Sequence, residues 1–216
     1  MKRLTITLCS AVLLFACNSN EKTADDPKKE ETKVASATDK TADPRPDSAT
    51  MMKNWEAYMT PGKEHQMLAE SNGTWTGEVS MWMSPDAPPS KSTSTCTNSM
   101  ILGGRYQQSV HKGNFGGMPF EGRSTLAFDN AKKVYISTWI DNMGTGVMIG
   151  EGPWNEATKT VHLKGKMIDP STGKECEFRE VFKIIDKDNQ VMEMYGPDMA
   201  TGKEFKTMEI KFTRKK

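Results

Sequence analysis

Residues 73–82 read GTWTGEVSMW, and their pattern is the clearest structural signal in the chain. From Trp75 to Met81, apolar or small side chains at every second position alternate with polar ones, which is the period of a strand with one buried face. Nine further segments of this kind follow, separated by turns rich in Gly, Pro, Asn and Asp. The ten expected strands are 73–82, 92–102, 105–112, 118–128, 134–140, 145–152, 160–168, 175–185, 190–195 and 205–213.

The order of these segments predicts an all-β domain. About ten strands follow one another through short connections with no helical pattern between them, so sequence neighbours are expected to pair as an antiparallel meander. A meander of this length removes its exposed edges by closing into a barrel. A β-sandwich of two sheets is the alternative. One or two short helical turns are expected in residues 51–70, with Pro61 at the start of the second, which gives a domain over residues 51–216.

The first strand also carries a recognisable motif. Gly73-Thr74-Trp75, just after the expected helix, resembles the G-x-W signature of lipocalins and related calycin barrels. In that group a basic residue on the final strand packs over the signature tryptophan. Arg214 has the inward parity of the last strand, two residues after Phe212. The resemblance therefore implies a lipocalin-like barrel closed by Gly73, Trp75 and Arg214.

A second resemblance covers nearly all of residues 60–214. Segments such as WTGEVSMWMSPDAPP (75–89), STWIDNMGTG (137–146) and EFKTMEIKFTR (204–214) are similar to an uncharacterised family of bacterial secreted proteins with a domain of unknown function. The resemblance supports the domain boundaries. It implies no particular reaction and no catalytic residues.

The first residues predict where in the cell the protein is located. Residues 1–17 read MKRLTITLCSAVLLFAC, a basic start and an apolar stretch too short to span a membrane, as in a secretory signal peptide over residues 1–16. Leu14, Ala16 and Cys17 resemble the bacterial lipobox, which implies that acylated Cys17 anchors the protein to a lipid bilayer. An ordinary signal peptide that happens to contain Cys17 is the alternative.

The segment 17–50 is expected to be a lipidated, disordered tether. After Cys17 it has no aromatic residue and one branched aliphatic, Val34, too little apolar surface to offset the entropy of ordering. These features predict a lipoprotein of the bacterial cell envelope, on the periplasmic side or at the cell surface. A net charge of +1 gives no support for a nucleic-acid partner.

The sequence gives few signals of catalytic chemistry. Cys96 and Cys176 are expected on strands that are not neighbours, so two buried free thiols are favoured over a disulfide. His65, His111 and His162 lack the spacing of a metal site and are expected at the surface or rim. Because G-x-S-x-G, H-E-x-x-H and a phosphate-binding glycine loop are also absent, no cofactor or metal is predicted.

The barrel interior is the candidate binding site. If Ile140 faces outward, Trp139 and Asp141 point inward near the mouth and could hold an amphipathic ligand. Alternatively, Ile140 faces the core and Asp141 only initiates the following turn. Methionines on the strands serve as core filling or as adaptable pocket walls. The candidate ligand-binding residues are Trp139, Asp141, Met148, Phe120, Glu180, Glu193, Met192 and Met194.

Two of these candidates are carboxylates, Glu180 and Glu193. Glu180 shares the strand parity of Phe178 and is expected inside, where a carboxylate must be paired or protonated. An ion pair with Arg123 or Arg105 is favoured over a role as a general acid.

These features predict a lipid-anchored envelope protein whose barrel binds a small, largely apolar ligand, a role that rests on fold analogy. One alternative is a hydrolase-like enzyme that uses an interior carboxylate, Glu180 or Glu193. Another is a structural envelope module with a filled barrel and no ligand. Binding is favoured over catalysis.

Overall fold

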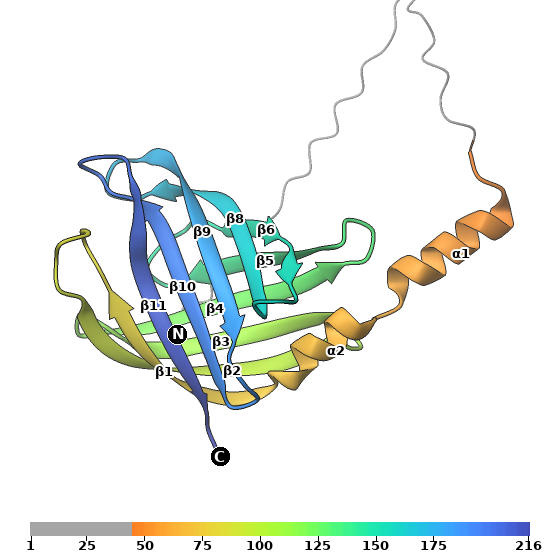
Figure 1. Ribbon diagram of the computed structural model, residues 1–216, viewed down its shortest axis with the longest axis horizontal. Helices are drawn as coiled ribbons and strands as arrows, with labels where there is room; N and C mark the ends of the chain where they lie inside the picture. The colour runs from red at the N-terminus through yellow and green to blue at the C-terminus, as the bar shows by residue number, and fades with distance from the viewer. Residues whose placement is uncertain (1–44) are drawn as a thin grey trace, which may run out of the picture. The chain divides into compact units, whose positions relative to one another are not determined.

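The computed structural model describes residues 45–216. The predicted signal peptide, the predicted acylation site Cys17 and most of the predicted tether lie outside the described residues. Two helices precede a sheet of eleven strands within the described part (Figure 1). The strands are β1 (Gly73–Met81), β2 (Ser90–Ile101), β3 (Tyr106–Phe115), β4 (Met118–Asp129), β5 (Val134–Asp141), β6 (Met148–Gly152), β7 (Trp154–Asn155), β8 (Thr160–Asp169), β9 (Lys174–Ile184), β10 (Asn189–Pro197) and β11 (Glu204–Arg214).

The sheet is a closed antiparallel barrel. Strands β1 to β6 pair in sequence order, β1 also pairs with β11, and the sheet continues through β10 and β9 to β8. A pairing between β6 and β8 completes the circuit, while the two-residue β7 lies outside the ring and pairs with β8. The prediction of an all-β meander of about ten strands, closed into a lipocalin-like barrel, is therefore confirmed. The sandwich alternative is wrong.

Glycines make the closing seam between β6 and β8. Gly150 on β6 pairs with Gly165 on β8. A Cβ atom at Gly165 would lie 2.1 Å from the carbonyl oxygen of Ile149, and one at Gly152 would lie 1.7 Å from that of His162. No side chain fits at these distances, so glycine allows the two strands to approach closely enough to pair.

Arg214 joins the last strand to the first. It pairs with Trp75 across β11 and β1, and its Cζ lies 4.2 Å from the centroid of the Trp75 ring. Nη1 donates to the carbonyl of Asn72 at 2.6 Å and Nη2 to that of Glu70 at 2.7 Å. The buried indole donates to the carbonyl of Ser71 at 2.9 Å. This side chain therefore ties β11 to both β1 and the segment before it.

The two helices are α1 (Ser48–Met59) and α2 (Lys63–Glu70). Asp47 caps α1 by accepting a hydrogen bond from the backbone of its first turn. Helical structure therefore begins three residues before the predicted domain boundary at residue 51. Pro61 lies in the break between the helices, so it precedes α2 instead of occupying its first position.

Helix α2 covers one end of the barrel. Its Leu68 is buried against Tyr135, Val161 and Leu163. Gly73, at a φ of 114°, then turns the chain from α2 into β1, a conformation that side-chain-bearing residues rarely adopt. Neither helix in the described residues has the length and apolar character needed to cross a membrane.

Replacing Arg214 with alanine should destabilise the fold by about 2–3 kcal/mol, because hydrogen bonds from a charged donor and a cation–π contact are lost together. Urea denaturation followed by tryptophan fluorescence measures this change. Arg123→Ala is the control, since Arg123 is exposed and pairs with Glu121, and it should cost less than about 1 kcal/mol. Equal losses for the two variants would contradict the closing role of Arg214.

Candidate functional site

The barrel encloses a cavity of about 430 Å³. This volume lies within the roughly 300–1,000 Å³ typical of small-molecule sites. The lining extends from Gln107 and Gln190, near α2, to Phe115 and Met143 at the opposite end. Phe115 and Met143 are 43% and 46% exposed, so the cavity reaches the surface at that end.

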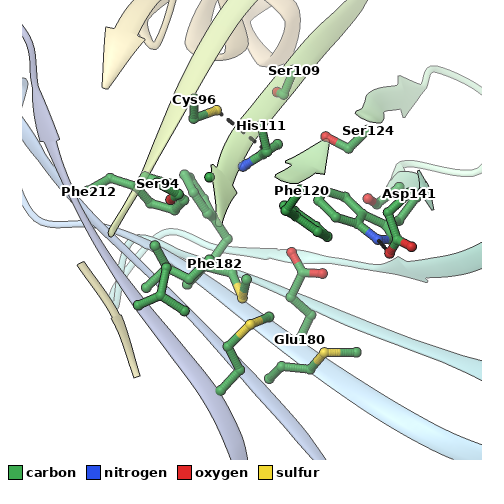
Figure 2. A pocket seen from close by; sticks show the side chains of 18 of the residues that line it. Ser94, Cys96, Ser109, His111, Phe120, Ser124, Asp141, Glu180, Phe182 and Phe212 are labelled. Atoms are coloured by element: carbon green, nitrogen blue, oxygen red, sulfur yellow. Dashed lines mark hydrogen bonds between the residues drawn. The ribbon is translucent and has the colours of Figure 1, made fainter. Parts of the chain in front are cut away.

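The cavity has a polar wall and an apolar wall (Figure 2). Strands β2 to β5 contribute hydroxyl groups to the polar wall, from Ser94, Ser109, Ser124 and Ser137. Strands β8 to β11 contribute mainly thioethers, aliphatic groups and phenyl rings, from Leu163, Phe182, Met192, Met194, Met208, Ile210 and Phe212. The Ser94 hydroxyl is buried without a hydrogen-bond partner among the described residues. The chamber is therefore mostly apolar, with a few polar groups on one side.

An aromatic cluster surrounds Trp139. Its ring stacks on Phe120, with 6.3 Å between centroids, and meets the edge of the His111 ring at 5.1 Å. Gly122 on β4 makes room for it, because a Cβ atom there would lie 2.3 Å from the indole. The glycine thus determines how deeply Trp139 sits in the wall.

Asp141 fulfils both of the roles expected for it, as a residue of the cavity wall and as the first residue of a turn. Ile140 is 48% exposed, while Trp139 and Asp141 line the cavity. Figure 2 shows the carboxyl group of Asp141 in the cavity wall. Asp141 Oδ2 accepts a hydrogen bond from Trp139 Nε1 at 2.7 Å, and Oδ1 accepts one from the backbone nitrogen of Met143 at 2.9 Å. The carboxylate therefore initiates the turn after β5 and also orients the indole in the cavity wall.

Glu180 projects into the cavity from the apolar wall. Its strand partners are Leu163 on β8 and Met194 on β10, and its carboxyl group points toward Phe120 and Asp141 (Figure 2). Burial raises the pKa of Glu180 to about 7, because the charged form loses its hydration. Within the described residues, no side chain forms an ion pair with it.

The predicted ion pair of Glu180 is wrong. Arg123 donates to Glu121 at 2.8 Å, and Arg105 donates to a backbone carbonyl in its own turn at 3.1 Å. Neither arginine lines the cavity. Strand alternation explains the position of Arg123, because the preceding Gly122 faces the interior.

The structure separates the remaining predicted residues into two groups. The cavity wall includes four of them, Phe120, Met148, Met192 and Met194. Glu193 lies between the two β10 methionines and faces the other side of the strand, where it accepts hydrogen bonds from Lys206 Nζ at 3.1 Å and Tyr195 Oη at 2.9 Å. The prediction that Glu193 belongs to the interior site is therefore wrong.

Two histidines also contradict the expectation of surface or rim positions. His65 is 5% exposed, and its Nδ1 accepts a hydrogen bond from the backbone nitrogen of Gly62 at 3.0 Å. His111 lines the cavity, where burial lowers its pKa to about 4 and keeps the ring neutral. His162 is half-buried and lies outside the cavity lining.

Sequence reasoning missed the contact between His111 and Cys96, whose Sγ lies 3.4 Å from Nε2 of the imidazole (Figure 2). The inward position of the cysteine could have been found from the strand register, because Cys96 pairs with the inward-facing Trp75. Cys96 and Cys176 are both free. Burial raises the pKa of the Cys96 thiol to about 12, so it is protonated at neutral pH.

The arrangement is suited to non-covalent binding. Burial lowers the pKa of His111 to about 4 and raises that of Cys96 to about 12, so the imidazole and the thiol that meet in the wall are both neutral at neutral pH. In residues 45–216, no three His, Cys, Asp or Glu side chains are close enough to hold a metal ion. What remains is an apolar chamber with hydroxyls, Trp139 and two acids.

The class of protein that the structure defines is a closed, ten-stranded antiparallel barrel with an internal cavity. The chain belongs to the family described as "Protein of unknown function (DUF1579)", whose model matches residues 60–214. No curated protein matches the sequence.

The comparison with solved structures supports the same architecture. Among 13 matching chains, the crystal structure of Rv2717c from M. tuberculosis has a TM-score of 0.56 and 14% sequence identity, and the match covers 73% of this chain and 100% of that chain. At this identity the likeness shows the barrel fold alone.

The environments of the two described thiols predict unequal reactivity. In the folded protein at about pH 8, iodoacetamide should modify the half-buried Cys176 well before Cys96, whose thiol is buried and protonated. Unfolding in urea should remove the difference. Peptide mass mapping of the alkylated sites measures both rates. Comparable rates in the folded protein would contradict the position assigned to Cys96.

Proposed function

We propose that the protein binds a small, largely apolar molecule in the barrel cavity while acylated Cys17 holds it at the bacterial cell envelope. The observation that carries the binding proposal is the cavity of about 430 Å³, with its apolar wall and few polar groups. A purely structural module would gain stability by filling this space, because empty interior volume is destabilising.

The envelope location is supported by the sequence of residues 1–17. A tethered barrel would stay close to a lipid surface, which is a source of apolar molecules. The loops at the open end carry exposed apolar side chains, Met83, Phe115 and Met199. These side chains would ease the passage of an apolar ligand between a lipid surface and the cavity.

One observation favours a catalytic alternative. With a pKa of about 7, Glu180 could hold or release a proton near neutral pH. A hydrolase using two carboxylates would also need Asp141. Both Asp141 oxygens already accept hydrogen bonds, from Trp139 and from the backbone of Met143. Binding is therefore the function that the geometry supports better.

Native mass spectrometry of the protein purified from its own host tests the proposal. We expect a co-purifying small molecule that is released when the protein is denatured. A ligand-free mass, obtained repeatedly after gentle extraction, would contradict a binding role.

Filling the cavity provides a second test. Ser124→Phe should weaken binding of the neutral apolar dye N-phenyl-1-naphthylamine by about tenfold or more, because the added ring occupies part of the cavity. Fluorescence titration measures the affinity. Thr125→Phe is the matched control, since Thr125 is the next residue on β4 and lies outside the lining. Equal losses for both variants would show that the dye binds elsewhere.

A further inference from the structure

The ionisable groups that line the cavity give it an acidic character. Asp141 and Glu180 both belong to the lining, and no lysine or arginine does so among the described residues. The other titratable groups there are His111 and Cys96, which are both neutral at neutral pH because burial lowers the pKa of the first to about 4 and raises that of the second to about 12. Among residues 45–216, no positively charged side chain in the lining offsets a negative charge on Glu180.

The basic side chains on the strands around Glu180 form ion pairs on the outer face of the barrel. Arg179, the preceding residue on β9, donates to Glu204 at 2.7 Å. On the neighbouring β10, Glu193 pairs with Lys206 at 3.1 Å. These ion pairs lie outside the cavity lining, so neither cation compensates Glu180.

The groups that face Glu180 inside the barrel are apolar, neutral or acidic. Its strand partners on β8 and β10 are Leu163 and Met194. Across the cavity lie Phe120, His111 and Asp141 (Figure 2). Within residues 45–216, no cation pairs with Glu180 and no donor makes a hydrogen bond to its carboxyl group. A bound molecule could supply both.

The aromatic side chains add a second attraction for positive charge. Phe120 and Trp139 stack with 20° between their planes, and Phe182 lies in the opposite wall. The faces of such rings attract a cation, most strongly where water is excluded. A cation in this cavity would thus meet ring faces as well as carboxylates.

We infer that the ligand of this cavity is an amphipathic cation, in which an apolar body carries one protonated amine that donates to the Glu180 carboxylate. The inference rests on the proposed binding function and adds the charge of the ligand. A molecule with a carboxylate head would instead bring a third acid into the cavity without a basic partner, which is unfavourable. The same chamber therefore discriminates between amines and fatty acids of equal length.

The pairing also determines how affinity depends on pH. Glu180 must lose its proton to pair with an amine, so affinity for the amine should rise as pH increases toward about 7 and then level off. An uncharged ligand such as an alcohol makes no such ion pair, and its affinity should not rise over this range.

Decylamine, decanol and decanoate provide a matched series of probes, since they share one chain length and differ in the head group. At about pH 8, where a primary amine is still protonated, decylamine should bind the full-length protein about tenfold more tightly than decanol, and decanoate should bind least. At about pH 5.5, the preference for decylamine over decanol should shrink. Isothermal titration calorimetry below the micellar concentrations measures these affinities.

Glu180→Gln tests the assigned partner. The variant should lose about tenfold in decylamine affinity and lose the rise with pH, while decanol affinity should stay within about twofold. Retained decanol binding also shows that the variant is folded. Glu193→Gln is the control, because it removes an acid from the outer face of the next strand and should leave both affinities unchanged.

The outcomes separate this inference from the proposed function. If decanol or decanoate binds as tightly as decylamine, or if Glu180→Gln keeps the preference for decylamine, the inferred ligand charge is wrong while apolar binding stands. If none of the three probes binds, both the inference and the proposed function fail.

Discussion

Closure of the sheet is the constraint on which the rest of this structure depends. The pairing of β6 with β8 and of β1 with β11 converts a meander into a tube, in which every second side chain faces one shared interior. Gly165 permits the first of these joints, and the stacking of Arg214 on Trp75 reinforces the second. Opening either joint would expose the cavity walls to water and remove the environment that defines the site.

The properties of the interior side chains follow from this closure. Exclusion of water drives ionisable groups toward their neutral forms, which raises the pKa of Glu180 to about 7 and lowers that of His111 to about 4. An unpaired acid and an interior space that side chains leave open both cost stability. Destabilising features of this kind are common at functional sites. The proposed ligand would explain both the unpaired Glu180 and the cavity.

Sequence patterns predict this fold well where polar and apolar residues alternate. Parity alone places Glu180 inside, and a signature on the first strand indicates its contact with the last. The pattern fails for His111, because the inward residues of β3 also include Gln107 and Ser109 and so provide no contrast in hydropathy. Ion pairs such as that of Arg123 depend on the strand face and on local side-chain geometry, which a single sequence does not specify. The close approach of β6 to β8 also could not be predicted, because a single sequence does not show which non-consecutive strands pair.

The protonation of Glu180 reports most directly on an enclosed apolar cavity that holds an unpaired acid. Carbon-13 NMR can follow the glutamate carboxyl groups of the protein through a pH titration, with Glu180→Gln to assign the resonance. We expect one glutamate resonance with a pKa of about 7, and we expect it to be absent from the variant. A Glu180 carboxyl that titrates near the ordinary value of about 4.3 would contradict it, because such a group must be hydrated or paired.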